Sequence, residues 1–99
     1  QLDTKLNFSF CPGISVINLS HNKIRLIKKT YFNFLFLLEI DLSFNRIEFI
    51  EYESFYLNDL KNLYLNNNRL KFLTDKYFSS VFYYRLSLNF QFNQLNYYE

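Results

Sequence analysis

The feature that most constrains this chain is a repeat of 23 residues. The segment LSHNKI at residues 19–24 returns as LSFNRI at 42–47 and as LNNNRL at 65–70. Three occurrences at one interval indicate stacked units, and such repeats must be recognised before any other element is assigned. The 99 residues of the chain are enough for a single modest core, so we expect one domain.

Apolar residues occupy fixed columns within each unit. With Ile14, Leu37, Leu60 and Tyr83 as position one, aliphatic residues recur at positions four, six, eleven and fourteen, and a Phe recurs at position nineteen. Alternation at positions four and six predicts a short strand with its apolar side chains on one face. So short a strand is not stable alone, so the strands of successive units must pair into a parallel sheet over a shared core. The strand columns hold Ile17, Ile40, Leu63 and Leu86 at position four, and Leu19, Leu42, Leu65 and Leu88 at position six.

Position nine holds an asparagine in each complete unit: Asn22, Asn45 and Asn68. After position six the chain must leave the sheet and bend inward, where its backbone groups lose contact with water. An Asn carries two donors and an acceptor on a short arm, so it can satisfy its own bend and the turn beside it. We therefore expect a structural column, whose loss at one position would cost roughly 1–3 kcal/mol. The alternative, that these residues bind a ligand or carry glycans, does not explain the interval.

The full pattern is LxxLxLxxNxL followed by xxLxxxxF. It resembles the leucine-rich repeat over residues 14–95, specifically the Phe-containing subclass common in receptor ectodomains. The resemblance implies an α/β-type solenoid: a right-handed superhelix with a short-stranded parallel sheet on its concave face and loops or short helical turns on its convex face. Two departures from that subclass are a unit one residue shorter than usual and the lack of a proline after position fourteen.

The ends of the chain follow the pattern less closely. Residues 1–13 do not fit it and are expected to form a cap or lead-in. In the last unit a constant interval points Leu86 and Leu88 inward, whereas a two-residue insertion brings Asn93 and Leu95 into phase. We expect a strand at Leu86–Leu88 followed by a widened turn through Asn93. The expected units are 14–36, 37–59 and 60–82, with a partial unit at 83–99.

The solvent-facing strand positions should align on the concave side. Their mixture of aromatic and charged residues is typical of protein-binding surfaces. A plainer explanation is that a chain with 13 Phe and 9 Tyr exposes some of them without a purpose. The predicted partner-binding residues are Glu39, Asp41, Phe44, Lys61, Tyr64, Tyr84, Arg85 and Phe90.

Other functional classes find little support. A net charge of +2 with scattered Lys and Arg does not indicate a nucleic-acid partner. The longest apolar run, 34–38, is far shorter than the ~20 residues that cross a bilayer, so membrane insertion is not expected. One Cys and one Gly exclude paired-cysteine metal sites and glycine-rich phosphate loops, so we expect no cofactor.

The one catalytic arrangement that the spacing allows is His21 with Asp41 and Ser43 on neighbouring strands. However, Ser43 repeats Ser20 and His21 aligns with Phe44, so the repeat explains these residues without catalysis. We therefore expect a non-enzymatic module that recognises a protein partner. The alternatives are a module that oligomerises through its uncapped terminal turns, or a fragment of a larger leucine-rich-repeat protein.

The compartment stays open. The lone Cys11 and a glycosylation sequon at Asn18, on a predicted strand, favour the cytoplasm. The resemblance to receptor ectodomains points instead to the cell exterior.

Overall fold

The structure, a computed structural model, describes residues 15–32, 36–57, 59–78 and 86–98. The expected cap at residues 1–13 lies outside this part of the chain. The elements are β1 (Val16–Asn18), β2 (Leu26–Ile27), β3 (Glu39–Asp41), β4 (Phe49–Ile50), β5 (Asn62–Tyr64), β6 (Phe72–Leu73), a 3-10 helix η1 (Asp75–Tyr77), β7 (Ser87–Asn89) and β8 (Tyr97–Tyr98).

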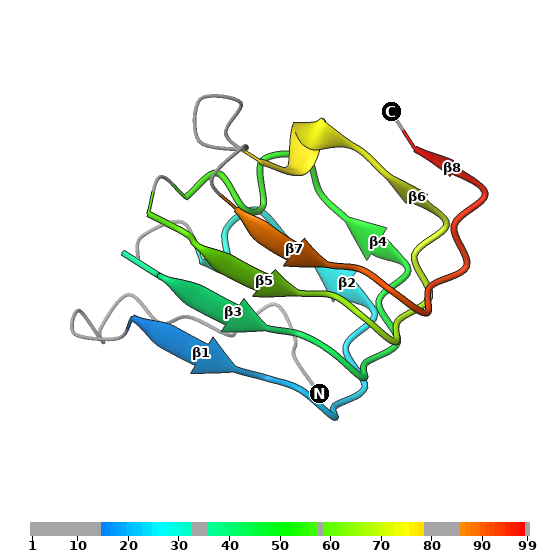
Figure 1. Cartoon of the computed structure of the whole chain (residues 1–99), viewed down its shortest axis with the longest axis horizontal. Helices are drawn as coiled ribbons and strands as arrows, with labels where there is room; N and C mark the ends of the chain where they lie inside the picture. Colours follow the sequence, from blue (N-terminus) through cyan, green and yellow to red (C-terminus); the bar gives the residue numbers. More distant parts are fainter. Residues whose placement is uncertain (1–14, 33–35, 58, 79–85, 99) are drawn as a thin grey trace.

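Four strands form one parallel sheet in the order β1-β3-β5-β7 (Figure 1). Ile17 pairs with Ile40, and Ile40 pairs with Leu63, which is the 23-residue interval of the sequence. Each of β1, β3 and β5 is three residues long. Its central residue, at position four, is buried, and the residues on either side of it face outward. The parallel sheet predicted from the repeat is confirmed.

The last strand of the sheet is displaced from its expected place. Leu63 pairs with Leu88 and Tyr64 with Asn89, so two extra residues precede β7 and do not follow it. The expected strand at Leu86–Leu88 with a widened turn after it is therefore wrong. The observed register brings Asn93 into the asparagine column, where its side chain bonds two backbone groups of the preceding unit; the constant interval would have put Gln91 there.

The core lies between the sheet and the opposite side of the coil. The aliphatic columns are buried, and Phe32, Phe55 and Phe78 form a stack with ring centroids 6.2 and 6.0 Å apart. Large apolar side chains of this kind contribute most of the free energy of folding, about 1.5–3 kcal/mol for each that is fully buried. The stack joins three consecutive units along the axis of the coil.

The opposite side contains a second set of strands, where the sequence predicted loops or short helical turns. β2 pairs with β4, and β6 pairs with β8, each as a two-residue parallel pair. The one helix among the described residues is η1, whose N-cap Thr74 accepts a hydrogen bond from the Lys76 amide at 3.2 Å. This helix is far too short to span a bilayer, and the described residues contain no other candidate.

Candidate functional site

The asparagine column fixes the turn at the end of each sheet strand. Asn45 Oδ1 accepts a hydrogen bond from the Ile24 amide at 3.1 Å. Its Nδ2 donates to the carbonyl oxygens of Leu19, Leu42 and Ser43 at 3.0–3.1 Å. One side chain thus joins its own bend to that of the preceding unit.

The other members of the column repeat this geometry. Asn68 accepts from the Ile47 amide at 2.9 Å and donates to Leu42 and Leu65 carbonyl oxygens. Asn22, in the first unit, is exposed, and among residues 15–32 and the other described ranges it bonds the carbonyl oxygens of its own turn, Leu19 and Ser20. The buried Asn side chains are fully engaged by backbone, which leaves them no role in binding a ligand.

The residue before each column Asn has a left-handed backbone. His21, Phe44, Asn67 and Phe92 have φ of 58°, 55°, 59° and 58°. Among residues other than Gly, this region is adopted mainly by Asn, Asp and His, so the two phenylalanines give no sequence signal for it. Because all four units share the conformation, it belongs to the architecture. Its effect is to hold each position-eight side chain at the end of the sheet, where the His21 and Phe44 rings stack with centroids 4.5 Å apart.

Position five supplies a second turn-forming side chain. Asp41 Oδ1 accepts hydrogen bonds from the Ser43 amide at 3.0 Å and the Ser43 hydroxyl at 2.6 Å. Asn18 and Asn89 accept from the backbone two residues later in the same way. This local bond is the usual way in which Asp and Asn form a turn. Asp41 therefore supports its own strand end as well as facing solvent.

These contacts do not form a catalytic triad. The Ser43 hydroxyl donates directly to Asp41, and Ser43 is buried. The imidazole of His21 packs flat against Phe44. A general base would have to lie between the nucleophile and the carboxylate, so the arrangement supports no nucleophilic chemistry.

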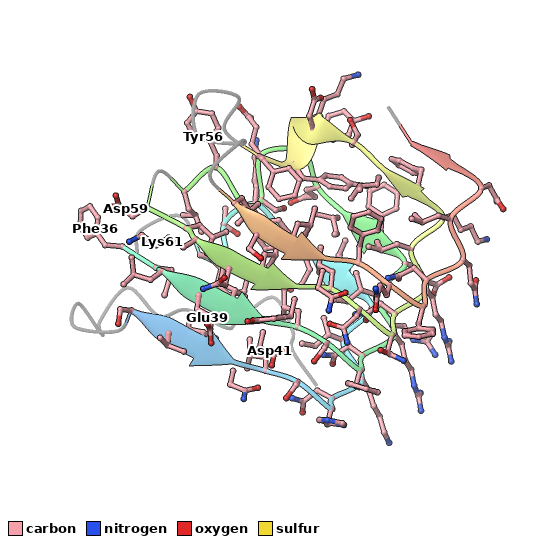
Figure 2. All side chains as sticks on the ribbon, in the orientation of Figure 1. Phe36, Glu39, Asp41, Tyr56, Asp59 and Lys61 are labelled. Carbon is pink, nitrogen blue, oxygen red and sulfur yellow. The ribbon has the colours of Figure 1, made fainter. Side chains whose placement is uncertain are left out.

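Most of the described residues predicted to bind a partner lie together on the outer face of the sheet. Figure 2 shows Glu39 and Asp41 on β3, with Lys61 at the start of β5. Phe44 is 45% exposed, and Tyr64 is half-buried on β5. Glu39 Oε1 also accepts from Asn62 Nδ2 at 3.4 Å. We call this surface the sheet face, comprising Val16, Leu38, Glu39, Asp41, Phe44, Lys61, Asn62 and Tyr64.

Three members of the sheet face, Val16, Leu38 and Asn62, occupy outward positions of the repeat but were not chosen as binding residues, and two of them are aliphatic. Val16 is 54% exposed and Leu38 is 40% exposed. The expected set took aromatic and charged residues as the signal for binding, whereas these are aliphatic. An exposed aliphatic residue at an outward position of a repeat would have been the signal to use.

Three predicted residues are not part of the sheet face as described. Tyr84 and Arg85 lie outside the described residues. Phe90 follows Asn89, the partner of Tyr64, so it takes the register position of Leu65, although its side chain is 37% exposed; its role in binding stays a prediction. This change of position follows from the displaced register, which gives the outward positions of β7 to Ser87 and Asn89.

The described residues also contain no group of three or more His, Cys, Asp or Glu side chains that could hold a metal ion. The polar groups of the sheet face are distributed over β3 and β5, with a bond between them from Asn62 to Glu39. Such a surface is better suited to broad contact with another macromolecule than to holding a metal ion.

Comparison with known proteins gave one match. The family model for the leucine-rich repeat matches residues 37–82, which include β3, β4, β5, β6 and η1. Searches of curated proteins and of solved structures found no significant match. Leucine-rich repeats are generally protein-interaction modules and are typically non-enzymatic. The family match and the parallel strands at the repeat interval together support a leucine-rich repeat in a solenoid-like α/β fold.

Proposed function

We propose that this chain is a non-catalytic recognition module that binds a protein partner through the sheet face. The observation that carries the proposal is the exposure of Val16, Leu38 and Phe44 beside Tyr64 on one regular sheet. Apolar side chains gathered on a rigid surface are the usual anchors of a protein interface. Tyr84 and Arg85 stay predicted members of the same surface.

Two features of the sheet face favour tight and selective binding. The strands are held by backbone pairing on both sides of β3 and β5, so the anchors lose little freedom when a partner binds. Lys61 and Glu39 flank the apolar residues and offer charges of both signs, which select a partner more than they strengthen binding.

The hydrogen bonds of the sheet face support a binding role over a catalytic one. Asp41, the carboxylate closest to a possible nucleophile, is engaged with the amide and hydroxyl of Ser43. The stack of Phe32, Phe55 and Phe78 supports the Phe-containing, receptor-like subclass as the origin of the fold.

The test is a double substitution, Phe44→Ala with Tyr64→Ala. Partners captured by the native chain are identified, and the affinity of each purified partner is then measured for three proteins: the native chain, the double variant and Phe49→Ala. We expect the double variant to raise Kd by at least about tenfold, since the loss of a central anchor costs more than 1 kcal/mol. Phe49 is exposed on β4, on the side opposite the sheet, and serves as the matched control.

An unchanged Kd in the double variant, with an unchanged melting temperature, would contradict the proposal. Light scattering across a concentration series on the same proteins tests the alternative of self-assembly. A dimer that persists in the double variant would point to assembly through the terminal turns.

A further inference from the structure

The side opposite the sheet is interrupted between β4 and β6. The Arg69 amide donates to the Ile47 carbonyl at 2.9 Å, and pairing resumes where the Glu53 amide donates to the Lys76 carbonyl at 2.8 Å. Between these points, the described residues show no backbone hydrogen bond from β4 to β6. The interruption leaves space for side chains to line a hollow.

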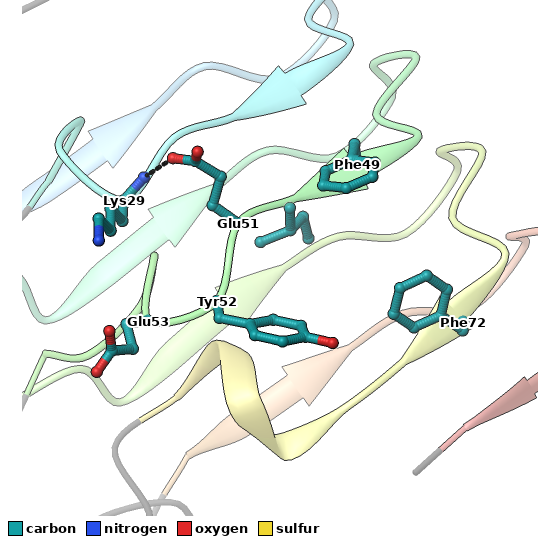
Figure 3. Close-up of a pocket in the computed structure, with 7 residues that line it drawn as sticks. Lys29, Phe49, Glu51, Tyr52, Glu53 and Phe72 are labelled. Carbon is teal, nitrogen blue, oxygen red and sulfur yellow. Dashed lines mark hydrogen bonds between the residues drawn. The ribbon is translucent and has the colours of Figure 1, made fainter.

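A hollow of about 330 Å³ opens at the interruption. Figure 3 shows Phe49 on β4 and Phe72 on β6, with the ring of Tyr52 pointing toward Phe72. Glu51, in the same wall, is already occupied, because its Oε1 accepts from the Lys29 amide at 2.8 Å. This first hollow is therefore mainly aromatic.

A second hollow of about 400 Å³ shares Tyr52 and Glu53 with the first. We call it the back hollow; its lining is Tyr52, Glu53, Tyr56, Asp75, Lys76 and Phe78. Both tyrosines are exposed, as are Glu53 and Asp75. Both carboxylates are therefore accessible at the lining of the hollow.

The back hollow already holds one cation. Lys76 Nζ lies 5.3 Å from the centroid of the Tyr52 ring. An aromatic face at this distance attracts a positive charge through its quadrupole. Among the described residues that line the hollow, two carboxylates outnumber this one ammonium group, so their summed charge is negative and favours a further cation.

The backbone of Glu53 is held in place on the edge of the hollow. Its φ of 67° lies in the left-handed region, which is costly for Glu. Hydrogen bonds from the Glu53 amide to the Lys76 carbonyl and from the Ser54 amide to the Glu51 carbonyl maintain it. A carboxylate on a fixed turn loses little freedom on binding, which favours recognition.

We propose that the back hollow binds an arginine side chain presented by a segment of a partner protein. The guanidinium group is planar and delocalised, so it can stack on a tyrosine ring and donate paired hydrogen bonds to a carboxylate. Tyr52 and Tyr56 supply the rings, and Glu53 and Asp75 supply the acceptors. Lys76 acts as an internal competitor for the face of Tyr52.

A pair of peptides tests the proposal on the native chain. The probes are acetyl-Ser-Leu-Arg-Leu-Ser-amide and the same peptide with citrulline, the neutral isostere of arginine, at its centre. In an NMR titration we expect the arginine peptide to shift the amide signals of Tyr52, Glu53 and Tyr56. The citrulline peptide should bind roughly threefold to tenfold more weakly. Equal binding of the two peptides, or no shift with either, would overturn the proposal.

Variants of the chain identify the residues responsible. Glu53→Gln, alone and with Asp75→Asn, should weaken the arginine peptide severalfold, whereas Lys76→Gln should strengthen it. Glu48→Gln removes an exposed carboxylate of the same unit that does not line the hollow, and should change nothing. If Glu53→Gln binds the arginine peptide as well as the native chain does, the proposal is wrong.

The result is independent of the proposed function of the sheet face. Phe44→Ala with Tyr64→Ala should leave the peptide titration unchanged. Shifts that map to the sheet face, or that vanish in this double variant, would also count against the back hollow.

Discussion

On the sheet side of this coil four strands pair without a break, whereas on the opposite side the described strands pair only as β2 with β4 and β6 with β8. The two sides differ in how constant their residues are. The bend after each sheet strand has an Asn in every unit, but position eighteen on the opposite side has Tyr31, Ser54 and Tyr77 in turn. The Asn side chains make equivalent hydrogen bonds from one unit to the next. The different side chains at position eighteen cannot repeat one contact in this way.

Tyr77 shows the consequence of that variation. It is fully buried, and its ring centroid lies 6.3 Å from those of both Tyr52 and Phe72. One of these neighbours precedes it by a whole unit and the other lies on β6. The large ring thus fills the region where the back pairing is interrupted, and the hollows open beside it. Residues that repeat in every unit therefore form the sheet, whereas residues that differ between units determine the shape of the opposite surface.

The largest expected effect tests the core that both sides share. Phe55→Ala removes the middle ring of the phenylalanine stack and should lower the free energy of unfolding by about 3–5 kcal/mol. Phe49→Ala removes a ring that is 59% exposed on the interrupted side, and should cost less than about 1 kcal/mol. Urea denaturation measures both, and similar midpoints for the two variants would show that the stack is not the main stabilising contact.

The second prediction concerns the bonds that keep the sheet side regular. Asn45→Leu leaves the Ile24 amide without its acceptor and removes one donor from each of three carbonyl oxygens, which keep their bonds to Asn22, Asn68 and the His21 amide. The cost should be roughly 1–3 kcal/mol. Asn22→Leu changes the same position in the first unit, where the side chain is exposed and its bonds within the described part of the chain are to its own turn. Thermal unfolding of the two variants should differ clearly, and equal melting temperatures would refute the role given to the column.

A smaller effect distinguishes two carboxylates of the sheet face. Asp41→Ala loses the bonds to the amide and hydroxyl of Ser43 and should cost about 1 kcal/mol. Glu39→Ala loses one long bond to Asn62 and should stay within about 0.5 kcal/mol of the native chain.

Asp41→Asn provides the control, because Asn18 accepts the equivalent bonds in the first unit. It should recover most of the stability lost in Asp41→Ala. If Asp41→Asn is as unstable as Asp41→Ala, the negative charge of Asp41 contributes more to stability than its hydrogen bonds to Ser43.

The smallest effect lies at the start of η1. Thr74→Val keeps the shape of a buried side chain but removes the bond to the Lys76 amide, which should cost about 0.5–1 kcal/mol. Thr30→Val changes an exposed threonine of the first unit and should be neutral in the same denaturation series. A neutral Thr74→Val would show that η1 is held by its tertiary contacts alone.

Much of the sheet side could be predicted from the sequence. The interval placed Ile17, Ile40 and Leu63 in register, because a parallel strand pair of this kind aligns equivalent residues. The same interval failed at β7, since it cannot tell on which side of a strand two extra residues fall. That choice depends on which register lets Asn93 bond the backbone of the preceding unit. The same choice moves Phe90 from the expected position eight to position six.

The candidate sites were predicted less completely. Glu39 and Tyr64 were expected on the outer face from alternation, and Lys61 and Phe44 from the architecture that the repeat implies. The aliphatic Val16 and Leu38 were not chosen. The left-handed backbone of His21 and Phe44 was not predicted, because the bonds that hold it come from the neighbouring unit: the His21 amide donates to the Ser43 carbonyl, and the Phe44 amide to that of Asn66.

By itself, the sequence determined the period of the coil, the columns that enter its core and the asparagine that closes each bend. These follow from residue types at fixed spacing, which act in the same way in every unit. Only the tertiary structure decided where the extra residues before β7 lie, where the back pairing is interrupted and which side chains line the hollows. Those features depend on contacts between non-equivalent residues of adjacent turns, such as Tyr77 with Tyr52, and a repeat pattern carries no information about them.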